Sequence, residues 1–251
     1  MAKSQINPKL VDEADRLLDQ LEGQGFDVRA LGGIAVKIVC GSNLEKSLDR
    51  EVADIDLITV KTQGSKVGKA LEDLGWEPDK QFNALNGARR MIFEAPDHGH
   101  KVDVFIDTFE MCHTIPLKNR VTAHPRTLAP ADLLLTKMQI VELNEKDRND
   151  IYALLAGVPV TEDEEDGISL RRITDLTSSD WGLHHTCEIN LERLRDGLPK
   201  LKLSRTAKGR IEKEIDRLEE AMEIAPKSRG WKLRAKIGEK KLWYEEVNEV
   251  D

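Results

Sequence analysis

Three aspartates at alternating strand positions are the residues of this sequence best suited to bind a cation. Asp54 and Asp56 stand in an otherwise apolar segment, residues 53–60, that alternates as a strand does. Alternate side chains of a strand share a face, so the two carboxylates point the same way with their Cα atoms ~7 Å apart. Asp103 lies between valines in a second apolar segment, residues 101–109. Because carboxylates so placed are costly unless they are paired or bind a cation, they predict a magnesium site.

The composition limits what such a pair of acids can prove. The chain has 46 aspartates and glutamates among 251 residues. By chance alone, an acid-x-acid triplet should therefore occur roughly eight times in a chain of this length. What distinguishes these three acids is their position within apolar strands. The formal net charge of -8 also argues against binding of nucleic acid through bulk positive charge alone.

A glycine pair, Gly32-Gly33, stands between a predicted strand over 26–31 and a predicted helix over 34–41. Glycine at a strand-to-helix turn lets a ligand approach the backbone, and the first N–H groups of the helix point at an anion. Phosphate is the expected guest. Such a turn also needs glycine for its own geometry, so the pair alone leaves both interpretations open.

Apolar spacing predicts the elements that must position these residues, and it favours an α/β (α+β) fold in which helices flank a mixed sheet. Strands are expected over residues 26–31, 53–60, 81–86, 89–94 and 101–109, with Asn86-Gly87 as a hairpin turn. Helices are expected over residues 8–22, 34–41, 64–76, 131–143, 146–155, 178–196, 204–225 and 229–247. We therefore expect a catalytic α/β domain over 1–127, helices packed on it over 128–158, and an all-helical C-terminal region over 167–251.

Taken together, the Gly32-Gly33 turn, Asp54-Ile55-Asp56 and Asp103 resemble the nucleotidyltransferase fold of the DNA polymerase β superfamily. The likeness is greatest to its small bacterial branches, which include toxin and abortive-infection nucleotidyltransferases and aminoglycoside nucleotidyltransferases. It covers about residues 27–155. The segment between the glycine turn and the paired acids is longer here than in the compact members of the superfamily.

The resemblance implies a magnesium-dependent enzyme that moves a nucleoside monophosphate from a nucleoside triphosphate to a hydroxyl, releasing pyrophosphate. It places the β- and γ-phosphates on Gly32 and Gly33. Two magnesium ions would be held by Asp54 and Asp56, and Asp103 would complete the second metal site or act as the base.

Two basic residues, Lys137 and Arg90, are weaker candidates for the same site. Lys137 resembles a lysine that contacts phosphate in several branches, and it is equally compatible with a helix surface. Arg90 would face either the triphosphate or solvent, and Arg50 is expected to support the strand that carries Asp54.

The acceptor is left open between a small molecule, an RNA end and a protein, and the oligomeric state is not indicated. The alternative is a non-catalytic binding or regulatory protein on a degenerate nucleotidyltransferase fold. Three separated cysteines predict no disulfide framework, and no stretch approaches ~18 apolar residues, so we expect a cytoplasmic protein with no membrane partner. Basic clusters over 200–210 and 227–236 are interpreted as solvated helix faces or as a docking surface for a polyanion such as tRNA.

Overall fold

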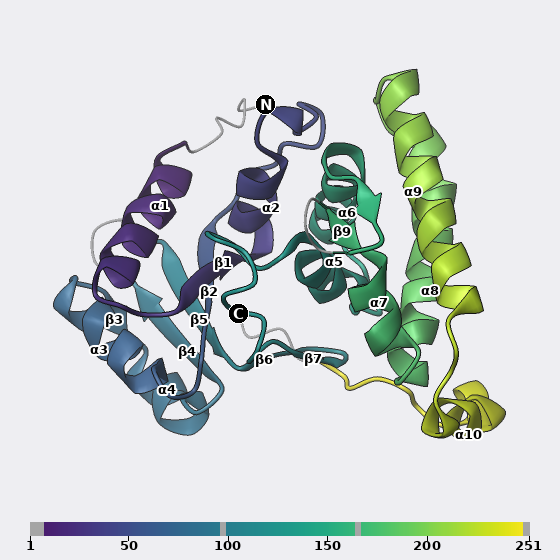
Figure 1. The fold of residues 1–251 in the computed structure, drawn as a ribbon. Helices are drawn as coiled ribbons and strands as arrows, with labels where there is room; N and C mark the ends of the chain where they lie inside the picture. Colours follow the sequence, from purple (N-terminus) through teal and green to yellow (C-terminus); the bar gives the residue numbers. More distant parts are fainter. Residues whose placement is uncertain (1–7, 96–98, 164–166, 248–251) are drawn as a thin grey trace. The chain divides into compact units, whose positions relative to one another are not determined.

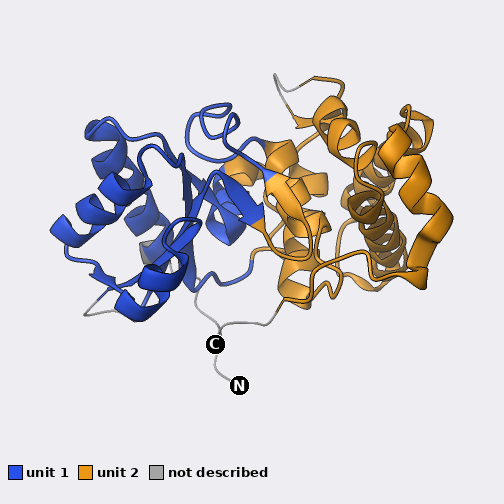
Figure 2. Ribbon diagram, turned by 90° about the horizontal axis from the view of Figure 1, so that it is seen from below, with its two compact units in different colours: residues 1–38, 50–109, 116–129 blue, residues 39–49, 110–115, 130–251 orange. Residues whose placement is uncertain are grey.

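The computed structural model describes residues 8–95, 99–163 and 167–247, which divide into two compact units (Figure 2). The units interleave along the sequence. Unit 1 is built from Met1–Ile38, Arg50–Phe109 and Pro116–Ala129. Unit 2 is built from Val39–Asp49, Glu110–Ile115 and Pro130–Asp251.

Unit 1 contains a five-stranded mixed sheet in the order β1-β2-β5-β4-β3. Its strands are β1 (Val28–Leu31), β2 (Asp54–Thr59), β3 (Glu77–Pro78), β4 (Arg90–Glu94) and β5 (Lys101–Ile106). The central pair β2 and β5 is parallel, and the remaining pairs are antiparallel. The fold predicted from the sequence, a mixed sheet with flanking helices and a helical C-terminal region, is confirmed.

Helices flank this sheet (Figure 1): α1 (Pro8–Gly23), α2 (Gly32–Cys40), α3 (Gly64–Asp73) and α4 (Lys80–Asn86). Close contact between α3 and the sheet depends on two glycines. A Cβ on Gly64 would lie 2.9 Å from Ile106, and one on Gly68 would lie 3.6 Å from Phe93. Phe93 pairs with Val102 of β5. Val102 and Ile106 both alternate with Asp103 along β5, so they lie on the opposite face of the sheet from Asp103. Helix α3 therefore covers the face of the sheet opposite to the acids.

The predicted strand over 81–86 is wrong, because these residues form α4. Asp79 caps the helix by accepting a hydrogen bond from the backbone N–H of Phe82 at 2.9 Å. Asn83, on this helix, holds both backbone groups of Ile92 in β4 with its side-chain amide. Gly87 has φ -59°, so no left-handed hairpin turn forms there. The Asn-Gly signal was overridden by this capping and by the bonds to β4.

Unit 2 is mainly helical. Its α-helices are α5 (Pro130–Met138), α6 (Glu145–Gly157), α7 (Leu170–Thr177), α8 (Trp181–Gly197), α9 (Arg205–Ile224) and α10 (Arg229–Ile237). Three short 3-10 helices are η1 (Gly41–Asn43), η2 (Leu198–Lys200) and η3 (Gly238–Lys240). Parallel strands β8 (Val160–Thr161) and β9 (Ile168–Ser169) pair here, while β6 (Thr108–Glu110) and β7 (Thr114–Pro116) lie where the chain passes between the units.

The long helix α9 is the centre of packing in unit 2, where it contacts α6, α7 and α8. Its buried face carries Ile211, Ile215, Leu218 and Met222, the apolar positions expected of an amphipathic helix. The predicted helix over 229–247 ends early, at Ile237, because Gly238 takes a φ of +58°. In the part of the chain that the structure describes, no helix is both long enough and apolar enough to cross a bilayer.

Candidate functional site

The register of β2 and β5 brings the three acids onto one face of the sheet. Asp56 is the direct partner of Asp103 across the parallel pair, and Asp54 is opposite Lys101. Since alternate residues share a face, all three carboxylates lie on the same side. Asp54 is exposed, Asp56 is half-buried and Asp103 is buried. These carboxylates thus form an acidic patch whose exposure to solvent decreases from Asp54 through Asp56 to Asp103.

The glycine turn lies directly against this patch. Gly32 follows Leu31, which is the partner of Asp56 in the antiparallel pair of β1 and β2. A Cβ on Gly32 would lie 1.9 Å from Oδ2 of Asp56, and the residue has φ +66°. Both the backbone conformation and the space therefore demand glycine here. The absence of a side chain brings the backbone at the start of α2 close to the Asp56 carboxylate.

Arg50 is a residue of this site that the spacing of the sequence motif does not indicate. Its guanidinium packs on the second glycine of the turn: a Cβ on Gly33 would lie 2.6 Å from Nη2 of Arg50. Its Nη1 donates to the carbonyl of Glu51 at 2.9 Å. The Arg50 guanidinium thus lies at the start of α2, although residues 34–49 separate Arg50 from the two glycines in the sequence. Only the fold brings the two together.

The guanidinium of Arg90 binds the carboxylate of Asp103 through several hydrogen bonds. Nε donates to both oxygens of Asp103 at 2.8 and 3.0 Å, and Nη2 donates to Oδ2. The guanidinium carbon also lies 5.6 Å from the ring centre of Phe82 and 5.1 Å from that of Phe105. Burial raises the pKa of Asp103, opposed by the hydrogen bonds and charge of Arg90, and Asp54 raises it further. Arg90 is therefore fixed by a charge-assisted fork and two aromatic faces.

Lys137, the other basic candidate, belongs to unit 2. Its ammonium lies 2.8 Å from Asp147 and 3.1 Å from Asp150, both on α6. Burial lowers the pKa of Lys137, and these two carboxylates more than reverse the effect, so its pKa is raised. The lysine thus joins α5 to α6 through a largely buried ion pair.

The donor chemistry of the acidic patch suits a hard divalent cation, because magnesium prefers carboxylate oxygens. Asp54 and Asp56 fit that requirement, because they lie on the same face of β2. Asp103 is engaged by Arg90 instead. Among residues 8–95, 99–163 and 167–247, no group of three or more histidine, cysteine, aspartate or glutamate side chains is arranged to hold a metal ion.

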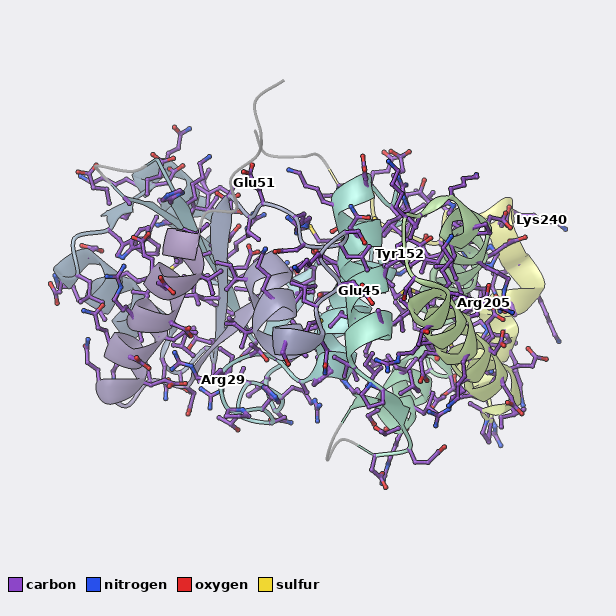
Figure 3. All side chains as sticks on the ribbon, turned by 90° about the horizontal axis from the view of Figure 1, so that it is seen from above. Arg29, Glu45, Glu51, Tyr152, Arg205 and Lys240 are labelled. Carbon is purple, nitrogen blue, oxygen red and sulfur yellow. The ribbon has the colours of Figure 1, made fainter. Side chains whose placement is uncertain are left out.

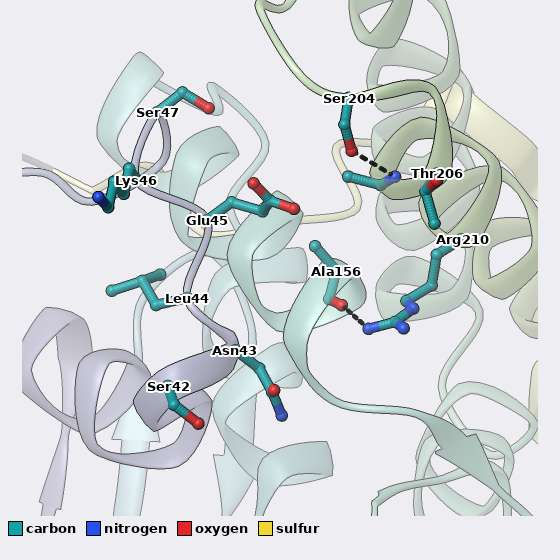
Figure 4. Close-up of a pocket in the computed structure, with 11 residues that line it drawn as sticks. Ser42, Asn43, Leu44, Glu45, Lys46, Ser47, Ala156, Ser204, Thr206 and Arg210 are labelled. Carbon is teal, nitrogen blue, oxygen red and sulfur yellow. Dashed lines mark hydrogen bonds between the residues drawn. The ribbon is translucent and has the colours of Figure 1, made fainter.

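A hollow of about 570 Å³ lies within unit 2 and is lined by none of the site residues above (Figure 4). It is bordered by residues 42–47, by the start of α9 and by the end of α6. Arg210 crosses one wall and donates to the carbonyl of Ala156 at 2.7 Å. The charged residues that line the hollow are of both signs: Glu45 is negative, and Lys46 and Arg210 are positive.

A family model described as "Uncharacterised nucleotidyltransferase" matches residues 3–154, which include β1, the glycine turn and all three acids. The chain belongs to this nucleotidyltransferase family. The family predicted from the sequence is confirmed, and the nucleotidyltransferase is an enzyme of the transferase class. A search of curated proteins finds no relative of the nucleotidyltransferase by sequence.

Solved structures similar to the nucleotidyltransferase are distant. A lincosamide antibiotic adenylyltransferase bound to lincomycin is 19% identical, with 59% of this chain and 96% of that chain covered and a TM-score of 0.40. The antibiotic-resistance factor ANT(2'')-Ia is 12% identical, with 58% and 82% covered and a TM-score of 0.41. An antigenic nucleotidyltransferase-like protein from Paracoccidioides brasiliensis is 12% identical, with 90% and 97% covered and a TM-score of 0.40.

Proposed function

We propose that this enzyme transfers a nucleoside monophosphate from a nucleoside triphosphate to a hydroxyl acceptor, with magnesium held by Asp54, Asp56 and Asp103. The observation that carries the proposal is the contact between Gly32 and Asp56. Backbone N–H groups that can bind a phosphate therefore lie next to carboxylates that can bind a cation. That cation would neutralise the charge of the phosphate. Magnesium on these carboxylates, two ions when all three acids take part, would offset phosphate charge and orient the reacting groups.

The chain's own groups have separate parts in the proposed reaction. The N–H groups at Gly32 and Gly33 bind the β- and γ-phosphates, and Arg50 adds a positive charge at the same turn. The acceptor oxygen attacks the α-phosphorus, and the bond from that phosphorus to the oxygen bridging to the β-phosphorus breaks. Pyrophosphate leaves with that oxygen, and Asp103 takes the proton of the acceptor hydroxyl.

This reaction requires Asp103 to exchange its partner. In the structure its carboxylate is held by Arg90, so a cation or a substrate proton can reach it only after the guanidinium withdraws. A bound triphosphate offers Arg90 a second anion of higher charge and a matching oxygen geometry. We therefore place Arg90 among the nucleotide-binding residues. Lys137 stays a prediction as a phosphate contact, because its ammonium would have to leave two carboxylates.

The test is label transfer. The protein is incubated with Mg²⁺ and each α-labelled nucleoside triphosphate in turn, against RNA, hydroxylated antibiotics and the protein itself. We expect one acceptor class to gain label and Asp54→Ala/Asp56→Ala to abolish the transfer. No transfer to any acceptor would favour the non-catalytic alternative, and transfer that survives the double substitution would contradict the assigned acids.

Other parts of the proposal follow from the chemistry of the chain. ATP is among the triphosphates to be tried. Cys40, Cys112 and Cys187 are buried free thiols, as suits the reducing cytoplasm in which we expect the reaction.

A further inference from the structure

The most basic stretch of this acidic chain runs through α10 and the turn after it. Residues 227–241 contain seven lysines and arginines and one glutamate, a local charge of +6 in a chain of net charge -8. The glutamate, Glu239, accepts from Nε2 of His185 at 2.8 Å and is thereby paired within the unit. Almost all the charged side chains of residues 227–241 are therefore positive.

Two of the seven cations serve the structure. Lys227 donates to the carbonyl of Ala225 at 3.1 Å and also to that of Met222, which caps the end of α9. Arg234 donates to the carbonyls of Gly238 and Lys241, both at 2.7 Å, and so fixes the turn after α10.

The other five form what we call the basic track: Arg229, Lys232, Lys236, Lys240 and Lys241. All five are exposed. Within the part of the chain that the structure describes, none of their side chains forms an ion pair, unlike Arg90, Arg126 or Arg195 elsewhere. Figure 3 shows the side chain of Lys240 at the outer edge of this unit. The charge of the basic track is thus available to a partner.

Helical spacing puts the first three members of the track on one side of α10. Arg229, Lys232 and Lys236 are three and four residues apart, so they share a face along about 10 Å of the helix axis. The opposite side packs on the unit: Trp231 contacts the ring of His184 with centroids 5.2 Å apart. The helix is also anchored at its start, where the N–H of Ser228 donates to the carbonyl of Ser178 at 2.9 Å. The exposed cations of α10 therefore lie on a helix that is held to unit 2 by these contacts.

We propose that the basic track is a docking surface for the phosphate backbone of RNA. Lysine is depleted in protein–protein interfaces, and four of the five cations are lysines, which argues against an acidic protein as the partner. A helix that lies on a membrane separates its basic face from its apolar face. Here α10 exposes two large apolar side chains, Leu233 and Ile237, which lie beside the cations and form a narrower apolar face than such a helix buries in a membrane. A row of lysines at helical spacing suits a row of phosphates.

The test measures binding with neither nucleoside triphosphate nor magnesium, so its result is independent of the proposed transfer reaction. Fluorescence anisotropy follows a labelled RNA stem-loop of about 20 nucleotides while KCl is raised from about 50 to 200 mM. Lys232→Gln/Lys236→Gln/Lys240→Gln should weaken binding at least ~10-fold at the lowest salt and reduce the salt slope by about 2. All three substitutions are at exposed positions, and an unchanged melting temperature verifies that the variant is folded.

A matched control removes the same charge elsewhere. Lys66→Gln/Lys118→Gln/Lys213→Gln alters three other exposed lysines and should keep RNA affinity within about twofold of the parent. Equal weakening in both triple variants, or no RNA binding by the parent at about 50 mM KCl, would overturn the proposal. So would tighter binding, through the same lysines, of anionic phosphatidylserine vesicles or polyglutamate than of RNA.

Discussion

At the scale of the single residue, Gly32 is where backbone conformation and chemistry meet. We expect Gly32→Ala to lower transfer activity at least ~10-fold, because a left-handed φ costs a residue with a Cβ about 1–2 kcal/mol and the new methyl displaces the Asp56 carboxylate. Transfer rate and melting temperature are the measurements. Gly209→Ala is the matched control: a Cβ there meets nothing within 4 Å, so activity should be kept and α9 stabilised. Full activity of Gly32→Ala would contradict the site.

His113 gives a prediction about pH. Burial lowers the pKa of its imidazole, and Nε2 lies 2.8 Å from Oγ1 of Thr186. The unfolded chain therefore takes up this proton at a higher pH than the folded chain does. Stability associated with His113 is present above about pH 6.5, the unfolded value, and is lost as pH falls through the lower folded value.

His113→Gln removes that titration while keeping a polar side chain. Melting temperatures measured from about pH 7.5 down to 5 should fall less steeply in the variant than in the parent, because glutamine does not titrate in that range. Identical slopes in the two proteins would show that the imidazole does not contribute. A comparison at about pH 7.5, where the imidazole is neutral in both states, isolates any cost from the altered hydrogen bond.

At the scale of secondary structure, one buried ion pair joins α5 to α7. Nε of Arg172 donates to Asp132 at 2.7 Å, and the Asp132 side chain is 0% exposed. Arg172→Met removes this partner from a buried carboxylate, so the free energy of unfolding should fall by about 3–5 kcal/mol in a urea titration. The corresponding change at Arg195, whose ion pairs are exposed, should cost under about 1 kcal/mol. Similar losses in both variants would contradict this difference.

The elements also show what could be predicted from the sequence. Strands β2 and β5 were predicted because their apolar residues alternate, and the three acids stood out against that alternation. The strand predicted over 81–86 was wrong, because the side chains of Asp79 and Asn83 form hydrogen bonds that no local pattern reveals. Helix α7 was not predicted, since its eight residues give too short an amphipathic pattern to be recognised.

At the scale of the whole molecule, the sequence motif predicted a family but not the full environment of its acids. The contact of Arg50 with Gly33, and the fork of Arg90 on Asp103, depend on strand order and register. Neither is encoded in the spacing of residues along the chain. The same is true of charge: the net charge of -8 does not reveal the basic track, whose five cations are exposed and form no ion pair among the residues that the structure describes.

We propose that the acids at the glycine turn direct attack on the α-phosphorus of a nucleoside triphosphate. Parallel reactions with α-labelled and γ-labelled triphosphate test this, when both the acceptor and the released pyrophosphate are followed. We predict that the acceptor gains only the α-label, that the γ-label appears in an equal amount of pyrophosphate, and that Asp54→Asn/Asp56→Asn abolishes both. Transfer of the γ-label to the acceptor, or undiminished α-label transfer by the double variant, would contradict it.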